Sequence, residues 1–394
     1  MKLVQFGAGK IGRSLVGQLF IGAGWDVVFV DILPDLVARL NAAREYAVVV
    51  KREGRADERR RIGPFRAVDG RLIGNVVPEV ADADLVATSV GMAAFSAVLP
   101  FLAAGIAERA RRGDPRPLDI IIAENARNAD RSFRDSLSAA LGPAFPLDER
   151  VGIVQASIDK MVPLMREADL AADPLQLFAE DHDSLVVNAC AFRGGVPAVK
   201  GIVAAADIGA YVDRKLFIHN LGHAATAYFG YAADQGVVLL ADALALNGVE
   251  AAVRAVMAEG AAAIGAAYPA SFSAPELATH VDGLIVRFKN RALGDTVHRV
   301  GRDLTRKLDR NDRVVGAMLL CAAHGLPCPS IAAAYRAALR FAAPDEEGRL
   351  WEADGRFRAE TLPRGLDAVL REVSRLDPAD SLDATVIAAV RAAG

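Results

Sequence analysis

Lys215, Asn220 and His223 stand at positions i, i+5 and i+8 of one short segment, residues 215–223. On an α-helix these side chains fall within about a 140° arc and an axial distance of roughly 12 Å, and the long lysine can reach back toward the other two. One helical face would then carry a base, a neutral hydrogen-bonding amide and an imidazole. The same spacing also fits a surface lysine on an amphipathic helix, so the interpretation depends on the rest of the chain.

A second group of side chains suited to chemistry is basic. Six cations occur within 15 residues of a chain whose net charge is −3: Arg299, Arg302, Arg306, Lys307, Arg310 and Arg313. Arginine and lysine bind phosphate and carboxylate groups, so this cluster predicts an anion pocket for a substrate. The alternative is an exposed helix face or a set of ion pairs at an interface.

The N-terminal residues carry a glycine pattern typical of dinucleotide binding. The pattern is Gly7, Ala8, Gly9, Lys10, Ile11 and Gly12. An apolar run at 3–6 precedes it, a helix is expected after it, and a second strand is expected at 25–30, which is the context that makes G-x-G-x-x-G specific. Gly7 would allow the tight turn, Gly9 would let the backbone approach a pyrophosphate, and Gly12 would let the helix pack closely on the strand. The helix N-terminus would face the phosphates.

Asp31 ends the second of these strands, 19 residues after Gly12. A carboxylate at this place accepts hydrogen bonds from the ribose hydroxyls of an adenosine and repels a 2′-phosphate. The next cation along the chain is Arg39. The sequence therefore predicts NAD rather than NADP as the cofactor.

Polar or small residues follow three further buried strands, expected at 85–89, 120–123 and 151–156. Because the carboxyl ends of parallel strands meet at one edge of a sheet, these residues should face the ligand crevice. In chain order they are Ser89, Val90 and Gly91, then Glu124 and Asn125, then Asp159 and Lys160. Ser89, Val90, Gly91 and Glu124 are expected to line the cofactor site.

Strands alternate with helices through the first half of the chain, which predicts an α/β fold with a doubly wound, parallel, Rossmann-type sheet. The charged residues 51–71 are expected to form a solvated connection. Glycines and a proline at 194–201 indicate a boundary, with an NAD-binding domain at 1–195 and a mainly helical substrate and catalytic domain at 196–394. In the second domain, helices are expected at 208–230, 248–265, 273–289, 312–324, 329–342, 363–375 and 380–392.

Composition limits the class of protein. With 394 residues, 53% of them hydrophobic, the chain can bury a sizeable core, and two domains are expected. The slightly negative net charge argues against nucleic-acid binding by bulk electrostatics. No signal peptide and no membrane-spanning segment are expected. Three cysteines without metal-ligand spacing argue against a disulfide framework or a zinc site, so we expect a cytoplasmic protein that uses no metal.

Several of these segments together resemble the polyol-specific long-chain dehydrogenases/reductases, the mannitol dehydrogenase family. The pattern Lys215-x4-Asn220-x2-His223 carries the resemblance most strongly. Further matching stretches lie at 6–13, 88–91, 123–125, 159–163 and 299–308. Within the family, the chain is most similar to the branch that acts on sugar alcohol phosphates. The likeness covers nearly the whole chain and thins toward the C-terminus.

The resemblance implies metal-free hydride transfer between a polyol carbon and the nicotinamide of NAD. Lys215 would be the general base, which requires that its pKa fall from about 10.4 toward the working pH. Asn220 and, from the other domain, Asn125 would donate hydrogen bonds to the substrate oxygen as charge develops on it. His223 would orient the substrate or the lysine. The expected substrate contacts are Asp159, Lys160, Arg299 and Lys307, with Arg302 and Arg306 at a phosphate.

The substrate expected from the resemblance and the basic cluster is an anionic sugar, with mannitol 1-phosphate and fructose 6-phosphate as the interconverted pair. An unphosphorylated polyol such as mannitol or arabinitol, or a hexonate/hexuronate pair, is the alternative for the same chemistry. A more remote alternative is a non-catalytic NAD-sensing regulator on the same scaffold. No nucleic-acid or membrane partner is expected, and the chain is expected to act as a monomer or homodimer.

Overall fold

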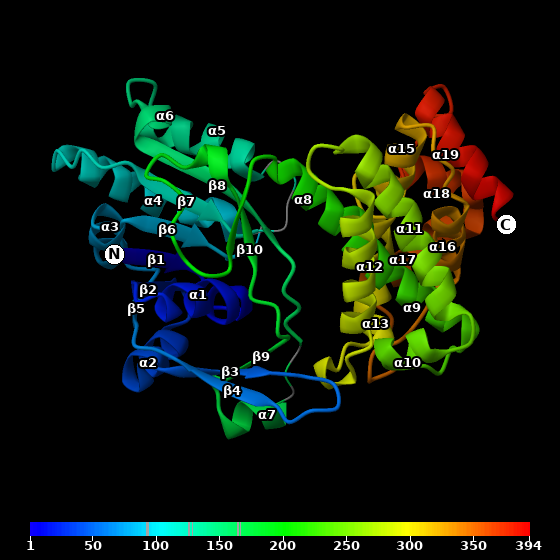
Figure 1. Cartoon of the computed structure of the whole chain (residues 1–394), viewed down its shortest axis with the longest axis horizontal. Coiled ribbons are helices and arrows are strands. Elements are labelled where there is room, and N and C mark those ends of the chain that lie inside the picture. Colours follow the sequence, from blue (N-terminus) through cyan, green and yellow to red (C-terminus); the bar gives the residue numbers. More distant parts are fainter. Residues whose placement is uncertain (92–93, 125–126, 128, 164, 166) are drawn as a thin grey trace. The chain divides into compact units, whose positions relative to one another are not determined.

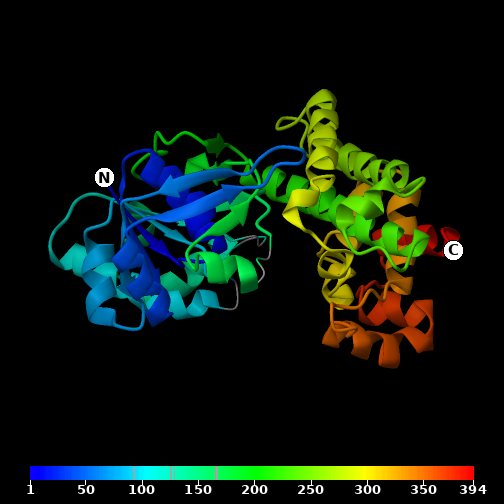
Figure 2. The same cartoon turned by 90° about the horizontal axis from the view of Figure 1, so that it is seen from below.

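The computed structural model spans residues 1–394 and describes all of them except 92–93, 125–126, 128, 164 and 166. The chain divides into two compact units, Met1–Val212 and Asp213–Gly394. The first unit contains strands and helices, and the second is helical (Figure 1, Figure 2). No described helix combines the length and the apolar character needed to cross a membrane.

A large sheet forms the centre of the first unit. Within the described residues it has eight strands, in the order β11-β10-β8-β7-β6-β1-β2-β5. They are β1 Lys2–Phe6, β2 Asp26–Asp31, β5 Arg66–Asp69, β6 Leu85–Thr88, β7 Leu118–Ile122, β8 Val151–Ile158, β10 Leu185–Asn188 and β11 Ile202–Ala205. Every neighbouring pair is parallel except β10 and β8. The predicted Rossmann-type sheet is confirmed, with one antiparallel pair near its edge.

Helices cover both faces of this sheet because its strands are apolar on both sides. In β1, Leu3 belongs to one hydrophobic core and Val4 to the other. The first core includes residues of the π-helix η1 Gly12–Gly17, of α1 Gln18–Gly22 and of α2 Pro34–Ala43. The second core includes residues of α3 Ile73–Ala81, α4 Phe95–Arg111, α5 Ala129–Leu141 and α6 Leu147–Arg150. β1 pairs with β2 on one side and with β6 on the other, so the strand order changes direction at β1. In this fold, the ligand crevice lies at the carboxyl ends of the strands at such a point.

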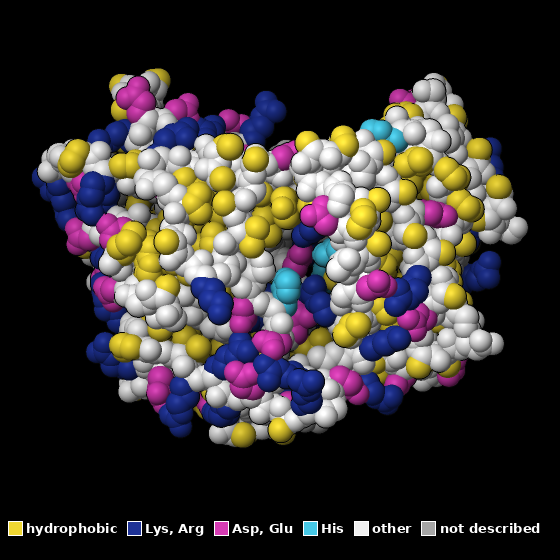
Figure 3. Space-filling model, viewed as in Figure 1, with side chains coloured by type: hydrophobic (Ala, Val, Ile, Leu, Met, Phe, Trp, Pro, Cys, Tyr) yellow, Lys and Arg dark blue, Asp and Glu magenta, His cyan; other side chains and the backbone are white. Residues whose placement is uncertain are grey.

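A smaller sheet has the order β4-β3-β9, with three strands in the described part of the chain: β3 Tyr46–Val50, β4 Glu58–Ile62 and β9 Leu177–Ala179. The prediction of a solvated connection over 51–71 is therefore wrong, because these residues include β4 and β5. The charged side chains of β4 have acidic partners: Arg59 is 2.5 Å from Asp173, and Arg60 is 2.6 Å from Asp183. Figure 3 shows positive and negative side chains interleaved over this part of the surface. The charged residues 58–62 can therefore form a strand, because carboxylates from other segments pair with their arginines.

A helical segment runs from α8 Ile208–Arg214, which crosses from the first unit to the second, through the π-helix η4 Lys215–Asn220 into α9 Leu221–Ala233. The remaining α-helices of the described residues are α10 Leu240–Ala245, α11 Val249–Ala267, α12 Ala274–Phe288, α13 Val297–Gly301, α14 Leu304–Lys307, α15 Val315–Ala323, α16 Pro329–Arg340, α17 Glu352–Arg356, α18 Leu366–Glu372 and α19 Ser381–Ala392. Each helix predicted in this half of the chain is found. The short helices α10, α13, α14 and α17 were not predicted, because one or two turns show too little periodicity.

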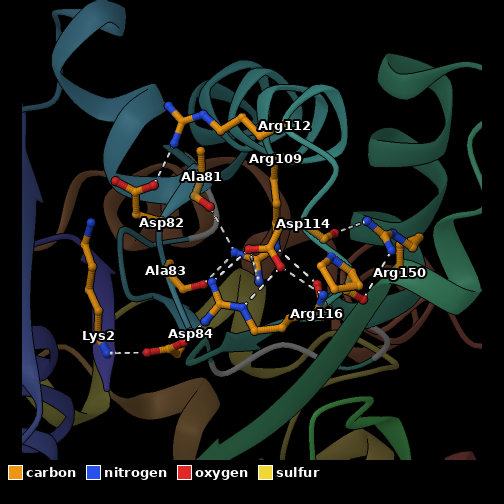
Figure 4. Close-up of polar contacts among 11 residues, drawn as sticks. Lys2, Ala81, Asp82, Ala83, Asp84, Arg109, Arg112, Asp114, Arg116 and Arg150 are labelled. Atoms are coloured by element: carbon orange, nitrogen blue, oxygen red, sulfur yellow. Dashed lines mark hydrogen bonds and ion pairs between the residues drawn. The ribbon is translucent and has the colours of Figure 1, made fainter.

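A buried arginine closes the amino edge of the large sheet, opposite to the glycine turn. Arg109 of α4 is 4% exposed, and its Nη1 donates to the carbonyl oxygens of Ala81 and Ala83, both at 2.9 Å. Its Nη2 lies 3.3 Å from a carboxylate oxygen of Asp114. Figure 4 shows this group of contacts, in which the end of α3, the residues before β6 and the turn before β7 converge. Arg109 therefore stabilises the fold at the edge opposite to the glycine turn.

We expect Arg109→Met to lower the free energy of unfolding by about 3 kcal/mol, because three carbonyls, including that of Arg116, and a carboxylate lose a donor. Arg111→Met on the same helix is the control, since the Arg111 side chain is 73% exposed and its partner is Glu108. That control should hardly change stability. Urea unfolding of both variants measures the difference, and equal midpoints would contradict the role of Arg109.

Candidate active site

The glycine turn after β1 has the shape that a dinucleotide requires. Gly7 has a φ of +89°, and a Cβ there would lie 2.6 Å from the carbonyl oxygen of Ser89. A Cβ on Gly12 would lie 2.0 Å from the carbonyl oxygen of Gly7, so neither position accepts a side chain. Beside Gly9, a Cβ would meet no described atom within 4 Å. The turn is thus closely packed at its two ends and open at Gly9, where a pyrophosphate would approach.

A buried cation that the sequence analysis did not identify holds this turn. Arg13 donates from Nε to the carbonyl oxygen of Ala8 and from Nη1 to that of Leu175, both at 2.6 Å. The Tyr46 hydroxyl donates to the carbonyl oxygen of Arg13 at 2.7 Å. In the sequence, Arg13 could have been noticed because an arginine directly follows the last glycine of the pattern, on a helix face expected to pack against the sheet. Arg13 fixes the Ala8 carbonyl of the glycine turn through contacts within the protein.

Asp31 lies beside the same turn. Its Oδ2 accepts a hydrogen bond from the Ala8 backbone N–H at 2.8 Å, and its Oδ1 accepts one from the Leu33 N–H at 3.0 Å. The carboxylate is therefore held at the carboxyl end of β2, next to the glycine turn, where an adenosine ribose lies in this fold. Contact with a ribose stays a prediction.

The loop after β6 is held by a glutamate from the end of the neighbouring strand. Glu124 is 7% exposed, and its Oε1 accepts hydrogen bonds from the backbone N–H groups of Val90 at 2.7 Å and Gly91 at 2.9 Å. Burial raises the pKa of Glu124. Ser89 accepts from Gln5 Nε2 at 2.9 Å through its hydroxyl. These contacts fix the loop within the protein, and contact of its residues with the cofactor stays a prediction.

Three other residues predicted for the site, Lys10 of the glycine turn and the pair Asp159 and Lys160 after β8, also lie in the first unit. Lys10 Nζ donates to the carbonyl oxygen of Pro163 at 3.2 Å. Lys160 is buried, with its Nζ 2.8 Å from the carbonyl oxygen of Ser14 and 2.5 Å from Asp183. Burial lowers the pKa of Lys160, although Asp183 raises it. Asp159 is also buried. The remaining predicted residue, Asn125, lies outside the described residues.

Lys215 and Asn220 are the first and last residues of the π-helix η4. A π-helix forms hydrogen bonds from residue i to residue i+5, so two residues five apart lie on the same side of it. In an α-helix they would be about 140° apart. The assumption of an α-helix over this segment is therefore wrong, and the π-turn aligns the lysine with the amide. His223 follows one turn later in α9, and all three side chains are half-buried.

Glycines of two neighbouring helices make room for this π-turn. A Cβ on Gly260 of α11 would lie 2.2 Å from the carbonyl oxygen of Phe217, in the middle of the turn. A Cβ on Gly316 of α15 would lie 2.7 Å from the Phe217 ring. The turn therefore depends on the absence of side chains at these two positions.

A buried carboxylate joins His223 to the basic cluster. The Nε2 atom of His223 is 3.0 Å from Oδ2 of Asp295, whose Oδ1 accepts from Arg299 Nε at 2.6 Å. Burial lowers the pKa of His223, although Asp295 raises it, so the imidazole is neutral near pH 7. Burial by itself would raise the pKa of Asp295, but His223 and Arg299 bring it to about 2. Asp295 was not among the predicted site residues, although it stands four residues before Arg299 at helical spacing.

Other cations of the basic cluster also have partners. Arg306 donates from Nε to Asp303 at 2.5 Å and from Nη1 to Asp312 at 3.0 Å. Lys307 is buried, and its Nζ donates to the carbonyl oxygens of Val300, at 2.6 Å, and of Arg302. Burial lowers the pKa of Lys307 well below its usual value.

The guanidinium of Arg302 lies 4.3 Å from the centre of the Trp351 ring. The ion pairs of Arg299 and Arg306 agree with the alternative interpretation of the basic cluster, in which its cations pair with carboxylates. The anion pocket stays a prediction.

The two units together define the class of protein. A Rossmann-type sheet with an open glycine turn is followed by a helical unit that carries an aligned lysine and amide with a neutral imidazole. Among the described residues, no group of three or more His, Cys, Asp or Glu side chains could hold a metal ion. A Rossmann-type sheet with an open glycine turn, followed by a helical unit, is the architecture of a dehydrogenase that takes a dinucleotide.

The particular family follows from comparison with known proteins. The mannitol dehydrogenase Rossmann domain matches residues 1–201, and the mannitol dehydrogenase C-terminal domain matches residues 207–374. The chain belongs to the mannitol dehydrogenase family. The resemblance based on the sequence motifs is thereby confirmed.

Relatives at 36% identity agree with this assignment, and solved structures share the fold. Mannitol-1-phosphate 5-dehydrogenase of Pseudarthrobacter chlorophenolicus is 36% identical over 346 residues, which cover 87% of this chain and 86% of the relative. The protein of the same name from Arthrobacter sp. is also 36% identical over 346 residues, with 87% of both chains covered.

A D-sorbitol dehydrogenase in substrate-free form has a TM-score of 0.76 at 18% identity, and the match covers 99% of this chain and 92% of that one. Pseudomonas fluorescens mannitol 2-dehydrogenase, in a ternary complex with NAD and D-mannitol, has a TM-score of 0.75 at 18% identity, with 99% and 91% covered. These two structures share the fold of this chain.

Proposed function

We propose that this protein is an NAD-dependent dehydrogenase that interconverts mannitol 1-phosphate and fructose 6-phosphate. The observation that carries the proposal is the π-turn, because it puts Lys215 and Asn220 on one side of a helix, one turn before His223. A base, a hydrogen-bond donor and a neutral imidazole in this order suit the oxidation of a secondary alcohol. The name of the 36% identical relatives supports the choice of a phosphorylated substrate.

The residues of the first unit fit a bound NAD, which supplies a hydride acceptor at C4 of its nicotinamide. The open space beside Gly9 suits a pyrophosphate, and the helix N-terminus after the glycine turn contributes N–H donors. Asp31 would accept hydrogen bonds from the ribose hydroxyls. A carboxylate at this place disfavours a 2′-phosphate, so NADH should support much faster turnover than NADPH.

The residues of the second unit would handle the proton. Lys215, in its neutral form, would take the proton of the substrate hydroxyl as the hydride leaves the carbon. Asn220 would donate a hydrogen bond to the oxygen on which negative charge develops. His223 is neutral and would orient the hydroxyl without adding a second cation near the lysine. In the direction of reduction, the Lys215 ammonium would return the proton to the carbonyl oxygen.

The substrate is tested by following NADH oxidation with fructose 6-phosphate, fructose, tagaturonate and fructuronate. We expect turnover of fructose 6-phosphate, with a kcat/KM well above that of fructose. Preference for fructose or for a hexuronate would replace the phosphorylated substrate by one of the alternatives. Turnover of none of the four would contradict the proposed enzyme activity.

Arg306→Ala should raise the KM for fructose 6-phosphate at least about tenfold, because a charge-assisted hydrogen bond to a phosphate is worth about 1.5–3 kcal/mol. The value of kcat should change less, since the phosphate is remote from the reacting carbon. Arg356→Ala is the control, because Arg356 is also an exposed arginine of the second unit with a carboxylate partner, Glu352 at 3.6 Å. Equal KM values for both variants would contradict a phosphate contact at Arg306.

A further inference from the structure

Asp295 lies between two side chains that are expected to contact the substrate. Its Oδ2 is 3.0 Å from His223 Nε2, and its Oδ1 accepts hydrogen bonds from Arg299 Nε at 2.6 Å and from Arg299 Nη2. Only 11% of the Asp295 side chain is exposed. One buried carboxylate therefore binds an imidazole with one oxygen and a guanidinium with the other.

The main chain around Asp295 is fixed. The Leu240 backbone N–H donates to the carbonyl oxygen of Asp295 at 2.9 Å, and Leu239 and Thr296 form an antiparallel bridge. The Thr296 hydroxyl also accepts from the Arg299 backbone N–H at 3.2 Å, which caps the helix on which Arg299 lies. Because this segment is held on both sides, the carboxylate keeps its place and its partners orient toward it.

We propose that Asp295 is a positioning residue of the active site, which fixes the tautomer of His223 and the direction of the Arg299 guanidinium at the same time. The inference rests on the proposed function, in which His223 and Arg299 contact the substrate. An ionised carboxylate only accepts hydrogen bonds, so the proton of the neutral imidazole lies on Nε2 and the lone pair lies on Nδ1. His223 then accepts a hydrogen bond from a substrate hydroxyl through Nδ1.

Phe288 fixes the remaining freedom of the imidazole. The rings of His223 and Phe288 are stacked, with centroids 4.9 Å apart and planes inclined by 23°. This stack holds the plane of the ring, but a half-turn about the Cβ–Cγ bond would preserve the plane and put the ring carbons Cε1 and Cδ2 in the places of Nε2 and Nδ1. The bond from Nε2 to Asp295 therefore selects one of the two ring orientations, the one in which Nδ1 rather than a carbon is presented to the substrate.

Several charged groups surround His223 and act on its protonation. Burial lowers the pKa of His223, Asp295 raises it, and the cations Arg299 and Arg313 lower it. The ring of His219 lies 6.0 Å away and is itself buried. Replacing the Asp295 carboxylate by a neutral amide removes the raising contribution, so the pKa of His223 should fall further. An amide also pairs with either tautomer, because it both donates and accepts.

Asp295→Asn tests the inference, because it keeps the shape of the side chain and removes its charge. Two-dimensional ¹H–¹⁵N NMR of the histidine side chains in the full chain, assigned with His223→Gln, should show the Nε2–H tautomer in the parent protein. In Asp295→Asn the Nδ1–H tautomer should appear. With fructose 6-phosphate and NADH, we expect KM to rise and kcat to fall by about tenfold each, since both partners lose a charge-assisted hydrogen bond. The acidic limb of the kcat/KM profile should move to lower pH.

Two further variants keep the test decisive. Asp295→Glu retains the charge and should retain the Nε2–H tautomer, even where activity is reduced. Asp242→Asn is the control, since Asp242 forms an ion pair with Arg291 at 2.5 Å in the same unit and is not expected to contact the substrate. It should leave the tautomer of His223 and both kinetic constants unchanged.

An unchanged His223 tautomer in Asp295→Asn would overturn the inference, whatever the loss of activity. A parent protein that fails to turn over fructose 6-phosphate would instead contradict the proposed function. The NMR result would then still decide whether Asp295 sets the tautomer.

Discussion

Replacement of Lys215 by methionine should lower kcat for fructose 6-phosphate reduction by about 10³-fold, because general acid–base catalysis by a positioned side chain contributes roughly 10²–10⁴-fold. Methionine keeps most of the length and apolar surface of the lysine but has no proton to give or take. The glycine turn and Asp31 belong to the other compact unit, so the dissociation constant for NADH should stay the same. Stopped-flow kinetics and fluorescence titration with NADH measure the two quantities separately.

Lys289→Met serves as the control for this prediction. Lys289 is a half-exposed lysine of the same unit, with Glu250 as its partner at 2.8 Å. It should have parental kcat and KM values. A Lys215→Met variant that keeps more than about a tenth of the parental kcat would show that another group transfers the proton. Loss of NADH binding in the same variant would show that Lys215 acts on the cofactor instead.

The second large effect is expected at a glycine that contacts no substrate. In Gly260→Ala the new methyl group would lie 2.2 Å from the carbonyl oxygen of Phe217, so the π-turn or α11 must move. A return of the turn to α-helical geometry would leave Lys215 and Asn220 about 140° apart. We expect kcat to fall by at least about 10²-fold, and overpacking to lower the free energy of unfolding by about 1–3 kcal/mol.

Gly283→Ala is the matched control for this substitution. Gly283 is also a glycine within a helix, α12, but it is exposed and a Cβ there meets no described atom within 4 Å. Alanine should stabilise that helix by up to about 1 kcal/mol and leave kcat unchanged. Parental kcat in Gly260→Ala would contradict the claim that the π-turn positions the catalytic residues. Circular dichroism and thermal unfolding of both variants separate this effect from loss of folding.

The parts of the fold that sequence predicted well depend on local patterns. Gly7 and Gly12 are needed because a side chain at either position would collide with the backbone, and a requirement of that kind is visible as a glycine. Buried parallel strands such as β7 contain an apolar run with polar residues after it, so their carboxyl ends were found to within one or two residues. In the second half of the chain, the helices longer than about two turns were recognised by their apolar spacing.

The features that the sequence did not reveal depend on residues distant in the chain. The arginines of β4 suggested a loop because their partners Asp173 and Asp183 lie more than 100 residues away. The π-turn at 215–220 depends on the space left by Gly260, which belongs to another helix. A turn with one residue more than an α-helical turn leaves no trace in hydrophobic periodicity.

The candidate site shows the same division between residue type and residue environment. The motif indicated Lys215, Asn220 and His223, because these residue types are what the chemistry needs. It did not indicate Asp295, which acts on the site only through the hydrogen bonds that it accepts. Lys307 appeared in the sequence as one more cation of a basic cluster, but in the structure its ammonium is buried and bound by backbone carbonyls.

The most direct test of the proposed function follows the hydrogen itself. Fructose 6-phosphate is incubated with the protein and with NADH carrying deuterium at C4 of the nicotinamide, and the product is identified by mass spectrometry and NMR. We predict mannitol 1-phosphate with one deuterium on the carbon that was the carbonyl carbon of fructose 6-phosphate. Deuterium in a different hexitol phosphate, or recovery of unlabelled fructose 6-phosphate alone, would contradict the proposal.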